Sequence, residues 1–211
     1  MTNLYSLKSI FIFALFINIF QCFGQIDQSN PIESLEKKIE IIQKNCNLNP
    51  DSTLIAIEKL LESTDTLLFC NEYAELVRLK GLAIFYKGQY STALDLFNKS
   101  RSLFKKTGNI DGESDAMNNI AVIYGRLGYF ETNLEMDLEI LEMRKKSGNS
   151  LKLAKSYNNI AVSLHRIKEF RKALENYLKA IDIYIQTGET TSIDLTYNNI
   201  GYIHLLENRL F

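Results

Sequence analysis

Helix-breaking residues are scarce in this chain, which has two prolines and ten glycines among 211 residues. The shortage excludes a loop-rich or disordered protein and favours an almost entirely helical one. Apolar residues make up 46% of the chain and charged residues 23%, which is enough for a core under an ordinary charged surface. The composition therefore predicts a folded all-α protein of the length of one ordinary domain.

Excess charge of either sign is also lacking, because the formal net charge is −1. No basic patch with interleaved aromatic residues is visible, so we expect no nucleic-acid partner for this segment. No phosphate-binding loop, nucleophile elbow or cleft of paired carboxylates can be recognised. We therefore expect a protein that binds no cofactor and catalyses no reaction itself.

Charge is almost absent from the first 24 residues, where Lys8 is the only charged side chain. The apolar run from Ile10 to Phe20 is short for a membrane span, which needs about 20 apolar residues. Small residues at Cys22 and Gly24 stand where a signal peptidase reads the chain. We expect a signal peptide over residues 1–24, cleaved before Gln25, and export to the periplasm or the extracellular space. The alternative is an uncleaved anchor, and either segment would be the only contact with a membrane.

Export would place Cys46 and Cys70 in an oxidising compartment, where a disulfide could form. Residues 32–46 and 51–63 have helical periodicity and are expected to form an antiparallel pair. A helix of about 14 residues spans roughly 20 Å, and this length would separate the two thiols beyond the reach of a disulfide. We therefore expect both cysteines to be buried free thiols.

A four-residue motif repeats at a fixed interval of 40 residues: Asn118-Asn119-Ile120-Ala121 returns at residues 158–161 and, with a final glycine, at 198–201. A fixed period of this size indicates an array of small supersecondary units that bury their apolar faces against one another. Glycines recur at the same interval, at Gly108, Gly148 and Gly188, where a helix is expected to end with a residue in the left-handed backbone conformation. We expect a first helix over residues 67–87, a turn at 88–90 and a second helix over 91–106, and the same order in the following repeats.

The repeats resemble those of tetratricopeptide-repeat proteins. In the third repeat the pattern of that family is carried by Ala161, Leu164, Phe170, Ala173 and Ala180, and in the second by Ala121, Tyr124, Gly128, Phe130, Asn133 and Ile140. Three positions depart from the pattern. Lys168 replaces the turn glycine, Asn133 replaces a packing alanine, and Lys80 stands where an apolar neighbour of Gly81 is usual.

The interval of 40 residues exceeds the 34 of the common tetratricopeptide form. We place the additional residues in a longer second helix and in the loop 109–112. The longer variant with paired asparagines resembles the repeats of kinesin light chains and of exported bacterial sensor and regulator proteins. HEAT and armadillo repeats have similar periods, but they lack this glycine–aromatic turn and this alanine spacing.

The resemblance implies an α-solenoid of antiparallel helix pairs, a tetratricopeptide superhelix, after the signal peptide. Residues 25–66 would form a degenerate helical pair, and residues 67–211 about three full repeats and the first helix of a fourth. We expect that last helix over 197–207, followed by a turn at 208–210. We also expect that the reading frame is truncated or split, or that a partner covers the exposed C-terminal helix.

In tetratricopeptide arrays the first helices line a concave groove, and this resemblance implies a site for a protein or peptide ligand. Asparagines at the groove position would hydrogen-bond the ligand backbone, since a carboxamide both donates and accepts; they are Asn119, Asn159 and Asn199. Their neighbours one position round the helix are Asn118, Asn158 and Asn198. Arg126 and Arg166 lie on the same face two turns further on and would hold a carboxylate. The alternative is that the asparagines cap or tie neighbouring helices and the arginines are solvated.

Other charged and titratable residues have structural interpretations. Lys105-Lys106 and Arg144-Lys145-Lys146 lie in the last turn of their expected helices, where cations complement the helix dipole. His165 and His204, the only histidines, occupy different positions in their repeats, so we expect neither a metal site nor a catalytic pair.

We therefore predict an exported tetratricopeptide-repeat scaffold that binds a protein or peptide and is not an enzyme. The alternative is the N-terminal sensory segment of a longer signalling protein, such as a histidine kinase or a helix-turn-helix regulator. The sequence does not identify the ligand.

Overall fold

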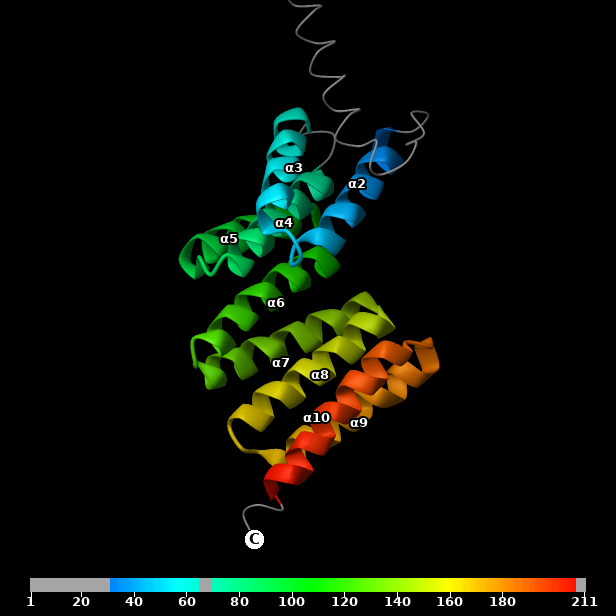
Figure 1. The fold of residues 1–211 in the computed structure, drawn as a ribbon. Helices are drawn as coiled ribbons and strands as arrows, with labels where there is room; N and C mark the ends of the chain where they lie inside the picture. The colour runs from blue at the N-terminus through cyan, green and yellow to red at the C-terminus, as the bar shows by residue number, and fades with distance from the viewer. Residues whose placement is uncertain (1–30, 65–69, 208–211) are drawn as a thin grey trace, which may run out of the picture. The chain divides into compact units, whose positions relative to one another are not determined.

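The computed structural model describes residues 31–64 and 70–207, and every regular element in these two ranges is an α-helix. The predicted signal peptide and the predicted turn at 208–210 lie outside the described residues. The all-α prediction is confirmed (Figure 1). The helices are α2 Pro31–Asn45, α3 Pro50–Ser63, α4 Cys70–Tyr86, α5 Tyr90–Thr107, α6 Ile110–Arg126, α7 Phe130–Ser147, α8 Ser150–Arg166, α9 Phe170–Thr187 and α10 Thr190–Glu207.

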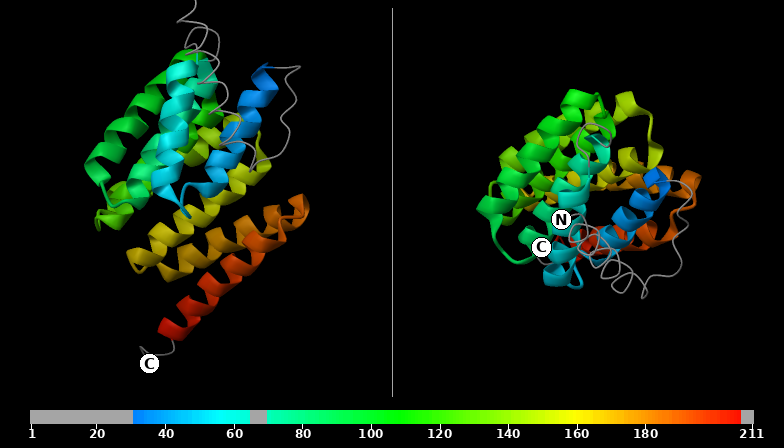
Figure 2. Two further views of the ribbon diagram at one scale, coloured as in Figure 1. Left: turned by 45° about the horizontal axis from the view of Figure 1, so that its top comes forward. Right: turned by 90° about the horizontal axis from the view of Figure 1, so that it is seen from above.

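The chain divides into two units, residues 1–41 and residues 42–211. Within the first unit, the described residues form the N-terminal part of α2. In the second unit the helices from α3 to α10 pack in chain order, each against the next (Figures 1 and 2). The first helix α4 also contacts α6, the first helix of the following repeat. This is the helix-pair solenoid that the repeats predict.

Asparagines fix the start of three helices. Asn49, Asn109 and Asn149 are N-caps whose side chains accept hydrogen bonds from the backbone N–H groups of Ser52, Gly112 and Lys152. Because α6 begins directly after Asn109, the predicted loop 109–112 is wrong. The additional residues of the repeat lengthen the helices instead, to 17 residues in α6 and 18 in α7. α10 begins at Thr190 rather than at Tyr197.

Glycines in the left-handed backbone conformation end the second helices, as expected. Gly108, Gly148 and Gly188 are C-caps with φ of 70°, 74° and 73°. The turns inside the repeats need the same conformation: Gly88 and Gly128 have positive φ, and Lys168 adopts φ 65° at the equivalent position of the third repeat. Lys168 is the only non-glycine residue with positive φ in the described chain, so its Cβ places strain in this turn.

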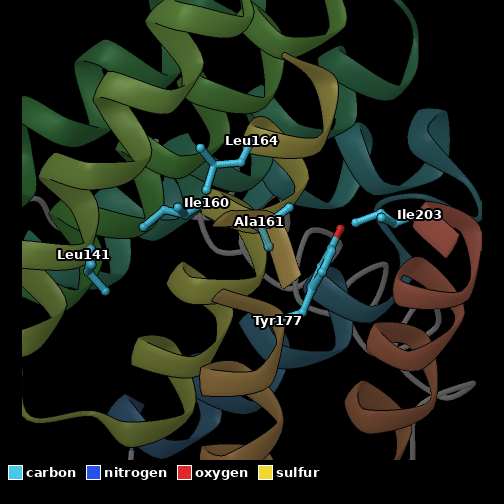
Figure 3. Close-up of a cluster of buried hydrophobic side chains, with 7 residues drawn as sticks. Leu141, Ile160, Ala161, Leu164, Tyr177 and Ile203 are labelled. Atoms are coloured by element: carbon cyan, nitrogen blue, oxygen red, sulfur yellow. The ribbon is translucent and has the colours of Figure 1, made fainter. Parts of the chain in front are cut away.

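In the first and third repeats, a small residue of the first helix packs against a large aromatic residue of the second. A Cβ built on Gly81 of α4 would lie 2.7 Å from the Phe97 ring of α5, so only glycine fits there. In the third repeat, Ala161 of α8 and Tyr177 of α9 are both fully buried in one cluster (Figure 3). Ile203 of α10 belongs to the same cluster, which therefore also joins the third repeat to α10. Burial of such clusters supplies the main stabilisation of the array.

The two cysteines have different environments. Cys46 is a buried free thiol, 1% exposed, and its Sγ donates to the carbonyl of Leu79 at 3.8 Å. Burial raises the pKa of this thiol to about 11, so it is unreactive at neutral pH. The prediction is confirmed for Cys46 but wrong for Cys70, which is exposed because it lies in the first turn of α4.

Replacing Lys168 by glycine should stabilise the protein by about 1 kcal/mol, because glycine adopts positive φ without the Cβ clash. Urea unfolding followed by circular dichroism measures the change. The converse substitution Gly128→Lys at the equivalent turn is the matched control and should destabilise by a similar amount. Equal stability of wild type and Lys168→Gly would show that this turn holds no strain.

Candidate functional site

The residues that the repeats predict as functional form one surface on the first helices, which we call the asparagine face. Residues at positions i, i+4 and i+8 share one side of a helix. In α6 and α8 the equivalent triplets are Asn118, Val122, Arg126 and Asn158, Val162, Arg166, and in α10 the face includes Asn198 and Tyr202. Val122, Tyr202, Asn198 and both arginines are exposed. The second asparagine of each pair lies one position further round the helix.

Several of the asparagines connect neighbouring repeats. The side-chain amide of Asn159 in α8 donates to Oδ1 of Asn118 in α6 at 2.6 Å. Oδ1 of Asn158 in turn accepts from the hydroxyl of Thr196 in α10 at 3.3 Å. These bonds show the tying role that the sequence left as the alternative. For Asn118, Asn158 and Asn159, loss of the side chain would therefore disturb the packing of the repeats as well as any ligand.

Asn119, Asn198 and Asn199 differ from those three. Nδ2 of Asn119 is buried and has no hydrogen-bond partner among the described residues. A buried amide donor without an acceptor costs about 1–3 kcal/mol, so this position carries an unused hydrogen-bonding group. Asn198 is exposed and Asn199 half-buried on α10. The asparagine face thus combines side-chain amides that join repeats with side-chain amides that form no hydrogen bond among the described residues.

Arg126 and Arg166 lie exposed in the last turn of their helices, at the end of the asparagine face next to the turns. The guanidinium of Arg126 lies over the Phe85 ring, 6.0 Å from its centroid. Beside Arg166, the rings of His165 and Tyr202 meet edge to face, with centroids 5.6 Å apart. Positive charge and exposed aromatic surface therefore occur together at this end of the face.

Arg144 of α7 lies in the last turn of its helix, as the sequence predicts, but the side chain is buried and does more than complement the helix dipole. The side chain is 3% exposed. Its guanidinium donates to Asp115 Oδ1 at 2.9 Å and to Ser114 Oγ at 3.3 Å, both in α6. In α8 it donates to the carbonyl of Lys152 at 3.2 Å and to Ser156 Oγ at 3.1 Å. One side chain therefore joins three consecutive helices. The signal was present in the repeat alignment, where Arg144 stands at the position of the buried Phe104 and Tyr184.

Further charged groups extend this contact. Lys152 of α8 pairs with Asp115 at 2.9 Å and with Asp111 at 3.4 Å, both in α6. In α4 the buried Arg78 donates from Nε to Glu75 at 2.8 Å. The pKa of Arg78 is raised because the favourable effects of Glu75 and of the Asp115 charge together outweigh the opposing effect of burial. The first helices α6 and α8 are thus linked by ion pairs near one end and by asparagines further along.

A second polar cluster lies between the second and third repeats, and it explains the departure at Asn133. A Cβ built on Gly125 would lie 2.6 Å from Asn133 Oδ1, so the asparagine fits because residue 125 is glycine. Nδ2 of Asn133 donates to Asp137 at 3.1 Å, and Oγ of Ser163 lies 2.7 Å from the same carboxylate oxygen. Asp137 is 3% exposed at a position where the neighbouring repeats bury Phe97 and Tyr177.

Burial raises the pKa of the Asp137 carboxyl to about 6, although the Ser163 hydrogen bond and the Arg144 charge both lower it. Among residues 31–64 and 70–207, no group of three histidine, cysteine or acidic side chains is placed to hold a metal ion. Within these same ranges no helix is long and apolar enough to cross a membrane.

Residues 114–186, which include most of α6, all of α7 and α8 and most of α9, match the family described as tetratricopeptide repeat. This part of the chain carries tetratricopeptide repeats. No curated protein matches the sequence. The matched residues include the two positions, Asn133 and Lys168, that depart from the pattern of the family.

Solved structures share the tetratricopeptide fold at low sequence identity. Aspartyl phosphate phosphatase F from Bacillus subtilis is 13% identical, with a TM-score of 0.68 over 80% of this chain and 45% of the other. A putative kinesin light chain with nearly identical repeats from Podosopora anserina is 14% identical, with a TM-score of 0.61 over 86% and 90%. A Rap protein complexed with competence and sporulation factor is 13% identical, with a TM-score of 0.53 over 89% and 55%.

This chain spans 45% of the phosphatase and 55% of the Rap protein. At such low identity the likeness concerns the fold alone. It supports a tetratricopeptide scaffold in which paired helices present a shared face, and the function of that face depends on the residues described above.

Replacing Asp137 by asparagine should stabilise the tetratricopeptide array at neutral pH, because the amide keeps the acceptor for Ser163 without a buried charge. The pKa of about 6 in the folded state lies above the unfolded value of about 3.9. The contribution of the carboxyl to stability is therefore fully present below about pH 4 and is lost as the pH rises through about 6. The advantage of Asp137→Asn should fall by ~1 kcal/mol between pH 8 and pH 5.

Urea unfolding at the two pH values measures this difference. Asp182→Asn on α9 is the matched control, since Asp182 is exposed and its removal should leave the pH dependence unchanged. An identical pH dependence in wild type and Asp137→Asn would contradict the buried-carboxyl account.

Proposed function

We propose that this tetratricopeptide chain is a non-catalytic scaffold that binds an extended peptide, or an extended segment of a protein, along its asparagine face. The observation that carries the proposal is the equivalence of the first helices. α6 and α8 present the same asparagine, valine and arginine at intervals of one repeat. A surface with regularly spaced identical groups suits a ligand whose own hydrogen-bonding groups recur regularly, which is a property of a peptide backbone.

The chemistry of the face fits such a ligand. Carboxamides both donate and accept, as peptide groups do, and the buried Nδ2 of Asn119 lacks an acceptor in the described chain. Val122 and Tyr202 offer exposed apolar surface, 38% and 56% accessible. The guanidinium groups of Arg126 and Arg166 can bind a carboxylate in a bidentate manner. We therefore propose a ligand with apolar side chains and an acidic group or C-terminus near the two arginines.

The Rap protein in complex with competence and sporulation factor offers a precedent for the fold, because there a similar helical array holds a bound partner. The phosphatase name belongs to the other neighbour, of which this chain spans less than half. The described residues contain a single strongly shifted carboxyl, Asp137, and it is enclosed between repeats. These observations favour binding over catalysis.

The test must separate ligand contact from repeat packing, since Asn118, Asn158 and Asn159 take part in both. We therefore choose Arg126→Ala combined with Arg166→Ala, because both side chains are exposed. Peptides selected against the wild-type chain from a display library should include an acidic family. These peptides should bind the double variant at least about tenfold more weakly, since each charge-assisted hydrogen bond contributes about 1.5–3 kcal/mol.

Arg171→Ala combined with Lys172→Ala on α9 removes the same charge from an exposed surface outside the face and is the matched control. It should leave binding unchanged, and circular dichroism should show equal helicity in all three proteins. If the selected peptides bind both double variants as tightly as wild type, the asparagine face is not the site.

We also propose that the scaffold acts outside the cytoplasm. The basis is the sequence of residues 1–24, with one charged residue and an apolar run that ends at small residues. Expression of the full chain in a bacterium with two membranes should yield periplasmic protein whose N-terminus is Gln25, as measured by intact mass. Cytoplasmic protein that retains residues 1–24 would refute the export proposal.

A further inference from the structure

The joint between the second and third repeats is polar on both sides. It holds Asp137 of α7 and Ser163 of α8, which are 3% and 1% exposed. The equivalent positions in the joints before and after it hold apolar pairs that each share one cluster: Phe97 with Ile123, and Tyr177 with Ile203. A carboxyl group therefore occupies the interior of a joint that is apolar in the neighbouring repeats.

Asp137 belongs to a closed set of side-chain hydrogen bonds among Asn133, Asp137 and Ser163, which we name the Asp137 cluster. Oδ2 of Asp137 accepts from Nδ2 of Asn133 at 3.1 Å and from the hydroxyl of Ser163 at 2.7 Å. The same hydroxyl lies 3.1 Å from Oδ1 of Asn133, so its one proton serves two acceptors. Because Ser163 is the member that comes from α8, these bonds hold α8 against α7.

The Asp137 cluster lies at the arginine end of the asparagine face. On α6, a Cβ built on Gly125 would lie 2.6 Å from Oδ1 of Asn133, and Gly125 directly precedes Arg126. On α8, Ser163 lies one turn before Arg166. The cluster is therefore placed between the two helix turns that carry the exposed guanidinium groups. The distance between Arg126 and Arg166 depends on how closely α8 packs on the cluster.

Neutral groups make the direct contacts of the Asp137 carboxyl, because its two hydrogen-bond partners are an amide and a hydroxyl. The charge that acts on it is that of Arg144 on the same helix, whose guanidinium is itself paired with Asp115 of α6. From α8, Lys152 also pairs with Asp115, at the opposite end of the helix from Ser163. Burial therefore raises the pKa of Asp137 to about 6 despite the charge of Arg144.

We propose that protonation of Asp137 closes the joint between the second and third repeats and thereby strengthens ligand binding at the asparagine face. This regulation rests on the binding function proposed above. A neutral carboxyl fits the dry joint, whereas hydration favours the ionised carboxyl, and water reaches it when α8 moves away from the cluster. A ligand that contacts Arg126 and Arg166 together must then close the joint as it binds, which weakens the observed affinity.

The closed joint gains stability on acidification. In the closed joint the pKa of the Asp137 carboxyl is about 6, and a hydrated aspartate has a pKa of about 3.9. Protonation therefore favours closure fully below about pH 4, and this advantage is lost as the pH rises through about 6. Between pH 5 and pH 8 the closing equilibrium should change by about tenfold.

Amide hydrogen exchange of the full chain tests the joint without a ligand. Protection factors of residues 130–140 and 160–166, corrected for intrinsic exchange, should be about tenfold lower at pH 8 than at pH 5. Those of residues 90–100 should be equal, because the joint there is apolar. Asp137→Asn should remove the pH dependence, since the amide is neutral and keeps an acceptor for Ser163. Asp182→Asn is the matched control on the exposed side of α9 and should behave as wild type.

A second variant rebuilds this joint in the form that it has in the third repeat. Asp137→Tyr combined with Ser163→Ile reproduces the pair at positions 177 and 203, and Ala121 of α6 provides the small residue that Tyr177 packs against in the third repeat. The apolar joint should show no pH dependence of protection. A pH dependence that both variants retain would contradict the assignment to the Asp137 carboxyl.

Fluorescence anisotropy with a labelled peptide of the acidic family, selected against the wild-type chain at pH 5, tests the effect on the ligand. The ratio of its affinities at pH 5 and pH 8 should be at least about threefold larger for wild type than for Asp137→Asn. His165 also titrates near this site, and its pKa is lowered by partial burial and by the charge of Arg166. Because His165 is present in both proteins, the comparison removes its contribution.

Equal protection of α7 and α8 at pH 5 and pH 8 in wild type would overturn the closing of the joint. Changed protection with the same affinity ratio in wild type and Asp137→Asn would overturn its effect on the ligand. If Arg126→Ala combined with Arg166→Ala leaves peptide binding intact, the proposed function fails and the regulation of binding fails with it. The exchange measurement needs no ligand, so it distinguishes failure of the joint from failure of the asparagine face.

Discussion

The buried guanidinium of Arg144 is the contact on which the alignment of consecutive repeats depends. Transferring such a group from water to a protein interior costs several kcal/mol unless its hydrogen bonds and its charge are matched. In this structure the match is complete only when α6, α7 and α8 stand in one register, because the partners lie on α6 and α8. A shift of one helix by a single turn would leave a buried charge without its carboxylate. Apolar packing alone tolerates such shifts more readily.

The alignment set by Arg144 positions the asparagine face. With α6 and α8 fixed, Asn118 and Asn159 are brought within 2.6 Å, and the exposed arginines follow two turns along each helix. The tying interpretation of the asparagines then applies to some members of the set. Those that bond to one another or to Thr196 maintain the spacing, and Asn119, Asn198 and Asn199 retain hydrogen-bonding capacity. A scaffold that presents groups at a constant interval needs rigid spacing first, since binding that must also order the scaffold is weaker.

Local signals explain how much of the fold could be predicted. The glycines at 108, 148 and 188 and the hydrophobic period depend on neighbours within a turn or two, and they placed the ends of the second helices correctly. The start of α6 was missed because the N-cap Asn109 directly after Gly108 begins the helix. The start of α10 was missed because it was predicted from the repeated motif alone.

The burial of Arg144 was missed because its partners lie 8 to 30 residues away in sequence. The fit of Asn133 against Gly125 likewise depends on the approach of two helices. In both cases the residue type does not indicate burial, whereas the equivalent residues of the other repeats are buried.

The central claim is that a ligand lies along the asparagine face of successive first helices. The most direct measurement is nuclear magnetic resonance of the side-chain amides and arginine Nε–H groups of the full chain, titrated with a peptide that it binds. The account predicts that the resonances of Asn119, Asn198, Asn199, Arg126 and Arg166 shift together and saturate together, while those of Asn98 and Asn176 on α5 and α9 stay in place. Shifts confined to the second helices would contradict it.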